Sequence, residues 1–131
     1  MYTYSFEKLD VWNESKDFTK SIYTITSTFP DQEKFGLVSQ LRRASVSICS
    51  NIAEGSARST YKDKAHFTTM AFSSAIEVLN QLILSFEMNF ISEEVYSKMR
   101  LELESITNKL NGLRNYQTNH ITKSTNNQIN E

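Results

Sequence analysis

The chain has 131 residues, enough for one domain, and its three glycines and single proline leave few positions for tight turns, which disfavours all-β folds. Its 14 basic and 15 acidic side chains give a net charge of −1, whereas dedicated nucleic-acid-binding proteins are usually basic. The single cysteine, Cys49, excludes an internal disulfide, and the N-terminus lacks a signal-peptide pattern, so we expect a cytoplasmic protein. No stretch reaches the roughly 20 apolar residues of a membrane span, so we expect no membrane partner.

The first helix is predicted over about 6–29 because apolar residues recur there at steps of seven, four, three and four. Pro30 should end it, since proline disfavours helical geometry in the residue before it. The residues that form this apolar stripe are Val11, Phe18, Ile22, Ile25 and Phe29.

The second helix is predicted over about 32–57, with Gly55 as its stop signal. Many of its residues are small, so we expect a neighbouring helix to approach it closely. Its core-facing positions should be Leu37, Leu41, Ser45, Ile48 and Ile52.

Two further helices are predicted over about 60–89 and 92–116. Thr60, followed by Asp63, should cap the third, and Ser92 should cap the fourth. The short loops between these segments force successive helices to be antiparallel. The sequence therefore predicts an all-α, up-down-up-down four-helix bundle over 1–116, and a polar, flexible tail over 117–131.

A line of polar residues runs along the second helix beside its apolar face. We interpret it as a structural network that fixes helix register, in which Arg43 pairs with Glu77 of the third helix at the edge of the bundle. The alternative is an ordinary solvated face. The residues assigned to this network are Gln40, Arg43, Ser47, Asn51, Glu54 and Glu77.

The segment 40–55, QLRRASVSICSNIAEG, resembles the signature of the bacterial 23S rRNA intervening-sequence protein family of four-helix bundles. Supporting segments are FEKLDVW at 6–12, FP at 29–30 and AFSSAIE at 71–77, so the resemblance covers roughly residues 6–116. The accessory protein of diversity-generating retroelements is related to this family. The resemblance implies a ring-shaped homo-oligomer, a pentamer, that binds RNA or DNA.

The chain departs from the family pattern in two respects. Cys49 stands where the family more often has proline, so the second helix should be straighter here. The retroelement relatives are strongly basic, whereas this chain has a net charge of −1. Residues 31–64 do carry six basic and four acidic side chains, a net +2, and a ring would repeat that charge.

Two functions remain open at this point. In the first, the chain binds RNA or DNA through sequence-independent phosphate contacts from Arg42, Arg58, Lys62 and Lys64, with Lys34 as a weaker candidate. In the second, it is a scaffold module that binds a protein partner and no nucleic acid. Salt-dependent binding to RNA would separate the two.

We expect no enzymatic activity, cofactor or metal site. The paired Glu-x-x-His pattern of di-metal bundles is missing, and the histidines are His66, near the start of the third helix, and His120, in the predicted tail. Cys49 has no histidine near it in sequence and should pack in the bundle, and the glycines are too far apart for a phosphate-binding loop.

The first helix is wider on its apolar side than one core requires. Phe6, Leu9 and Trp12 recur at steps of three and are offset from the main stripe. We interpret these residues as an oligomer interface.

Overall fold

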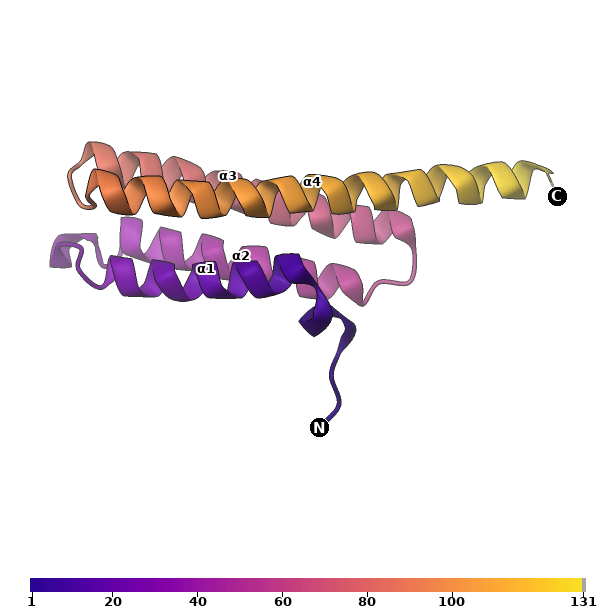
Figure 1. The fold of residues 1–131 in the computed structure, drawn as a ribbon, viewed down its shortest axis with the longest axis horizontal. Coiled ribbons are helices and arrows are strands. Elements are labelled where there is room, and N and C mark those ends of the chain that lie inside the picture. The colour runs from indigo at the N-terminus through magenta and orange to yellow at the C-terminus, as the bar shows by residue number, and fades with distance from the viewer. Residues whose placement is uncertain (131) are drawn as a thin grey trace.

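The computed structural model describes the backbone of residues 1–130 and the side chains of residues 1–121. Four helices, α1 (Asp10–Thr26), α2 (Leu37–Ser56), α3 (Tyr61–Glu87) and α4 (Glu93–Asn130), lie lengthwise beside one another, with connections at alternating ends (Figure 1). Short 3₁₀ turns, η1 (Ser5–Lys8) and η2 (Asp31–Glu33), precede α1 and α2. The fold is the predicted all-α four-helix bundle.

The first two helices begin later than predicted, because a glutamate just before each helix accepts a hydrogen bond from a backbone N–H. At the start of α1, the Glu7 carboxylate accepts a hydrogen bond from the Tyr4 backbone N–H at 2.7 Å, which favours a separate turn. Before α2, the Glu33 carboxylate accepts from the Leu37 N–H at 3.2 Å. Glu33 thus caps α2 from the preceding turn, and the helix begins five residues later than predicted.

Both predicted N-caps of the later helices are confirmed. The Thr60 hydroxyl accepts a hydrogen bond from the Asp63 N–H at 3.1 Å, and the Ser92 hydroxyl accepts one from the Val95 N–H at 3.2 Å. Each satisfies a backbone donor that a helix start leaves unpaired.

The fourth helix is longer than predicted. It continues past residue 116 to Asn130, and Figure 1 shows it extending beyond the other helices. Gln117, which we placed in the tail, is buried, and it forms a 2.7 Å hydrogen bond with Thr68 of α3. The bundle boundary therefore lies C-terminal to Gln117. The prediction of a flexible tail concerns mainly residues 122–131, whose side chains lie outside the described residues.

The core contains the predicted apolar stripes of α1 and α2, with Ile25 only partly buried. Every core-facing position predicted for α2 is buried, including the polar Ser45, and α4 contributes an unbroken line at steps of four, three and four. Side chains that are less than 2% exposed include Phe18, Ile22, Leu41, Ile48, Val78, Leu82, Met99, Ile106 and Leu110.

Small residues set the spacing between α2 and α3. A Cβ atom added at Gly55 would lie 2.9 Å from the Cβ of Phe67, closer than two such atoms can approach. Gly55 is therefore required by the approach of α3, and α2 ends one residue after it. The Ser47 and Ser74 hydroxyls meet at 2.9 Å on the same interface.

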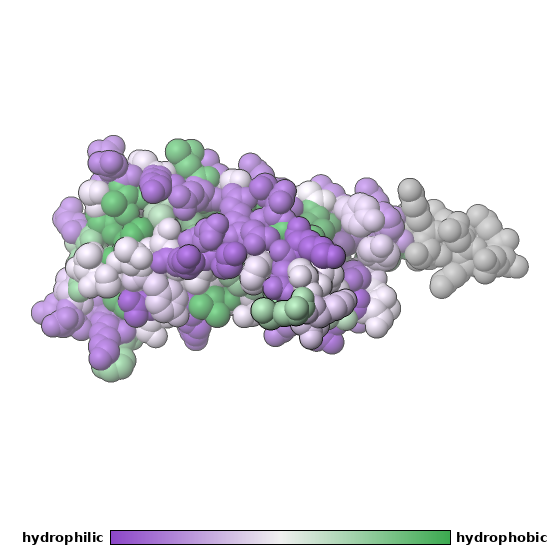
Figure 2. Space-filling view, turned by 60° about the horizontal axis from the view of Figure 1, so that its bottom comes forward, coloured by the Kyte–Doolittle hydropathy of each residue, from purple (hydrophilic) through white to green (hydrophobic). Residues whose placement is uncertain are grey.

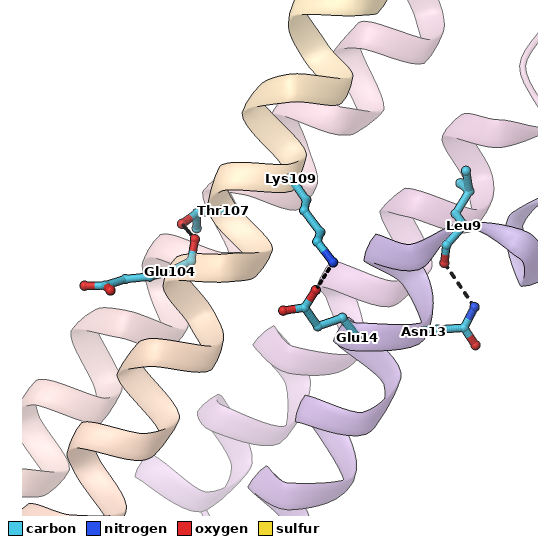
Figure 3. A network of polar contacts seen from close by, with 6 residues as sticks. All are labelled: Leu9, Asn13, Glu14, Glu104, Thr107 and Lys109. Atoms are coloured by element: carbon cyan, nitrogen blue, oxygen red, sulfur yellow. Dashed lines mark hydrogen bonds and ion pairs between the residues drawn. The ribbon is translucent and has the colours of Figure 1, made fainter.

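Polar contacts also join α1 and α4, which pack less extensively than α2 and α3. Lys109 of α4 forms an ion pair with Glu14 of α1 at 2.8 Å (Figure 3). Burial opposes ionisation of Glu14, but hydrogen bonds from Lys109 and Ser105 and the charge of Lys109 outweigh it, so the pKa of Glu14 is lowered.

We predict that this pair makes a small, pH-dependent contribution to stability. Because the folded-state pKa of Glu14 lies below its unfolded value, the contribution is present above the unfolded pKa and is lost as the pH falls through the folded pKa. Replacing Lys109 with glutamine should raise the Glu14 pKa in an NMR titration. An unchanged pKa would show that the pair does not form in solution.

By length and composition, α3 is apolar enough to cross a membrane, with a window of mean hydropathy 1.2. Core helices of soluble proteins have the same character. Here its residues Ala71, Ala75, Val78 and Leu82 are buried, and the helix packs against both α2 and α4.

Candidate nucleic-acid interface

The predicted phosphate-binding residues lie at opposite ends of the bundle. Lys34 and Arg42 lie near the α1–α2 connection, whereas Arg58, Lys62 and Lys64 lie at the α2–α3 turn. The intervening helix rises by about 1.5 Å per residue, so the two groups are more than about 20 Å apart. The structure does not bring them together into one surface.

Arg42 is occupied by contacts within the chain. Its Nε donates to the Thr26 hydroxyl at 2.9 Å and its Nη2 donates to the Tyr23 carbonyl at 3.3 Å. Its guanidinium also lies 4.6 Å from the centre of the Tyr23 ring. Arg42 therefore satisfies carbonyl and hydroxyl groups near the end of α1, which makes it a poor candidate for phosphate binding.

Three of the predicted cations lie at the α2–α3 turn, and we call Arg58, Lys62 and Lys64 the corner cations. The Arg58 guanidinium lies 4.4 Å from the centre of the Phe67 ring. Lys64 Nζ donates to the Ser56 carbonyl at the end of α2, at 3.1 Å. Lys62 is exposed and forms no ion pair or hydrogen bond with the side chains described, so its ammonium group is free to meet an anion.

Aromatic rings lie beside the corner cations, and they are not among the site residues predicted from the sequence. The ring of His120 lies 4.7 Å from that of Tyr61 and 4.0 Å from that of Tyr116. A hydrogen bond with Tyr116 raises the pKa of Tyr61. The four-residue spacing of Tyr116 and His120 places both on one helical face and indicates this cluster in the sequence. The cluster was not predicted because 117–131 was interpreted as a tail.

A pocket of about 240 Å³ opens next to this cluster. It lies between η1, the end of α2, the start of α3 and α4, and its wall combines apolar, aromatic and polar side chains. These include Leu9, Ile52, Leu113, Tyr61, Tyr116, Lys64, Thr68 and Gln117.

The predicted polar network forms only in part. Asn51 donates to the Ser47 carbonyl at 2.9 Å and to its hydroxyl at 3.1 Å, and Gln81 donates to Gln40 at 3.5 Å. Glu54 is exposed.

The ion pair expected between Arg43 and Glu77 is not formed. Both side chains are exposed, and within residues 1–121 the ion pair present is Lys109–Glu14. Water solvates the two charges, so there is no desolvation cost for pairing to offset. The α2–α3 register is instead marked by the Ser47–Ser74 hydrogen bond.

The predicted oligomer-interface residues make contacts within their own chain. Phe6 and Trp12 pack edge to face with ring centres 4.9 Å apart, and Leu9 and Trp12 pack against the core. Tyr2 and Tyr4 are 77% and 61% exposed, on an N-terminal segment that projects from the bundle in Figure 1. On the face shown in Figure 2, apolar residues form separate patches among hydrophilic ones. The interface assignment remains a prediction.

Reactive groups are sparse among residues 1–121. No cluster of three or more His, Cys, Asp or Glu side chains suited to a metal occurs there. The half-buried Cys49 thiol lies 3.5 Å from the Thr19 hydroxyl, and burial raises its pKa. Little of this thiol is ionised at neutral pH, so it is a weak nucleophile.

Comparisons with known proteins agree on one relationship. A family model described as 23S rRNA-intervening sequence protein matches residues 7–112. The structure is similar to that of a protein of unknown function from the S23 ribosomal protein family of Bacteroides thetaiotaomicron, at 23% sequence identity and a TM-score of 0.72. That similarity covers 79% of this chain and 97% of the other and concerns the fold. No curated protein matches the chain.

Proposed function

The chain belongs to the 23S rRNA-intervening sequence protein family, and from that premise we propose that it is a non-enzymatic, homo-oligomeric module that binds RNA or DNA through phosphate contacts. The observation that carries the proposal is the group of corner cations at the α2–α3 turn. Arg58 and Lys62 are exposed there, with Lys64 beside them.

Electrostatics and neighbouring aromatic rings support this location. Lys62 has no anionic partner among the side chains described, and Arg58 is held on the Phe67 ring rather than by a carboxylate. Both therefore keep their positive charge available to a polyanion. Aromatic rings beside cations are typical of surfaces that bind single-stranded nucleic acid.

Assembly would compensate for the weak charge of one chain. The family resemblance implies a pentameric ring, which would present the corner cations five times over. Phosphate contacts made by several copies at once raise the overall affinity without any new contact within a copy. A net charge of −1 per chain is then compatible with local attraction of a polyanion.

Chemical protection of lysines tests the proposed site. With excess single-stranded RNA at low salt, acetylation of Lys62 by a small reagent should slow several-fold, because a bound phosphate shields its ammonium group. Lys98 of α4 is also exposed and is the control, so its rate should not change. Peptide mass spectrometry measures the acetylation of each lysine. Equal acetylation of Lys62 with and without RNA would argue against the site.

A further inference from the structure

The pocket beside the corner cations is large enough for a small planar molecule. Its volume is about 240 Å³, whereas a water molecule in the liquid takes about 30 Å³. Leu9, Ile52 and Leu113 provide apolar surface, and Tyr61 and Tyr116 provide aromatic surface. Such a mixture suits a heteroaromatic ring better than it suits a chain of ordered waters.

Gln117 lines the pocket, and its side-chain amide has more hydrogen-bonding groups than its bond with Thr68 occupies. Its side chain is 6% exposed, and it is paired with the hydroxyl of Thr68 at 2.7 Å. The Thr68 hydroxyl also lies 3.1 Å from the Lys64 carbonyl, and a hydroxyl has only one proton to donate. Thr68 therefore donates to one neighbour only.

Two arrangements satisfy this hydrogen-bond count. Either Thr68 donates to the Gln117 amide oxygen, or the amide nitrogen donates to Thr68 while Thr68 donates to the Lys64 carbonyl. In the first arrangement the Gln117 NH₂ group does not bond Thr68, and in the second arrangement the Gln117 amide oxygen does not bond Thr68. Because Gln117 lines the pocket, one end of a buried amide is available to a bound molecule as donor or acceptor.

The pocket and the corner cations are continuous along the chain. Tyr61 and Lys64 line the pocket, and Lys62 lies between them at the start of α3. Tyr61 also has the Tyr116 ring 6.2 Å away, in an edge-to-face arrangement. A nucleotide whose phosphate meets Lys62 or Arg58 therefore has its base within reach of an aromatic wall.

We propose that this pocket receives one unpaired base of a bound RNA or DNA strand, which stacks on Tyr61 and bonds Gln117 with its polar edge. The proposal rests on the proposed function, because the corner cations must first hold the strand. Bases in a duplex are paired and stacked, so they cannot enter the pocket without being unpaired first. The chain should accordingly prefer single strands to duplexes.

Fluorescence anisotropy with a labelled 12-nucleotide strand and its duplex tests this inference. Tyr61→Ala should weaken single-strand binding about 5- to 150-fold, the range found for loss of one base–aromatic stack, and should leave duplex binding unchanged. Tyr61→Phe retains the ring and should restore single-strand binding. Phe35→Ala removes an aromatic side chain that is 89% exposed near the opposite end of the bundle, and it is the control.

The outcomes separate the pocket from the wider function. Equal affinity for strand and duplex, with no effect of Tyr61→Ala, would overturn the pocket while leaving phosphate binding intact. Competition by a free mononucleotide at micromolar concentration would also overturn it, because the ligand would then be the free nucleotide. The absence of binding to any nucleic acid at low salt would overturn both proposals.

Discussion

Replacing Ile106 with alanine is expected to lower the free energy of unfolding by about 2–5 kcal/mol, the range for truncating a fully buried aliphatic side chain. Ile106 is 0% exposed and lies at the centre of the α4 stripe, between Leu103 and Leu110. The loss combines the transfer free energy of the removed carbons with the cavity they leave. Typical domains are stable by about 5–15 kcal/mol, so the change is a large fraction of the total. Urea denaturation followed by circular dichroism measures it.

Leu101→Ala is the matched control on the same helix. Leu101 is 66% exposed, so its truncation should change the free energy of unfolding by no more than about 0.5 kcal/mol. If the two variants were equally stable, α4 would not pack with the face described here.

Neutralising the corner cations is expected to weaken nucleic-acid binding strongly. Each phosphate contact with a single strand contributes about 0.7 to the slope of log K against log salt, so loss of two contacts at about 0.1 M salt costs about 25-fold in affinity. The variant is Arg58→Gln with Lys62→Gln. Its affinity for single-stranded RNA should fall by that factor, and its salt slope should decrease by about 1.4, as measured by fluorescence anisotropy.

The double variant Lys98→Gln with Arg100→Gln is the control. It removes one lysine and one arginine from α4, so the net charge changes by the same amount while the corner is untouched. If both double variants weakened binding equally, the attraction would come from overall charge rather than from the α2–α3 turn. Thermal unfolding of each variant would show that the bundle is retained.

Periodicity was sufficient to predict the bundle because the apolar stripes are regular and the turns are short. Leu37, Leu41, Ile48 and Ile52 are all buried at the predicted spacing. Helix ends were predicted less accurately where a side chain provides an alternative cap, as Glu33 does before α2. The extension of α4 was missed because Gln117 is polar, and periodicity counts only apolar residues. Its burial depends on a partner, Thr68, that is 49 residues away in sequence.

The candidate site was predicted in composition but not in arrangement. The sequence identified the basic character of 31–64, but it did not reveal that Arg42 bonds Thr26 while Lys62 bonds none of the side chains described. Such differences depend on which helix lies opposite each side chain. The Arg43–Glu77 pairing failed for the same reason, because matching steps along two helices do not fix which way each stripe faces.

The most direct test of the account is the salt dependence of binding to generic single- and double-stranded RNA and DNA, with the particle mass measured in the same buffer. Binding should weaken steeply as salt rises, and the particle that binds should be several times heavier than the single chain of 15.1 kDa. An intact oligomer that binds no nucleic acid at low salt would contradict it and would indicate a scaffold for a protein partner.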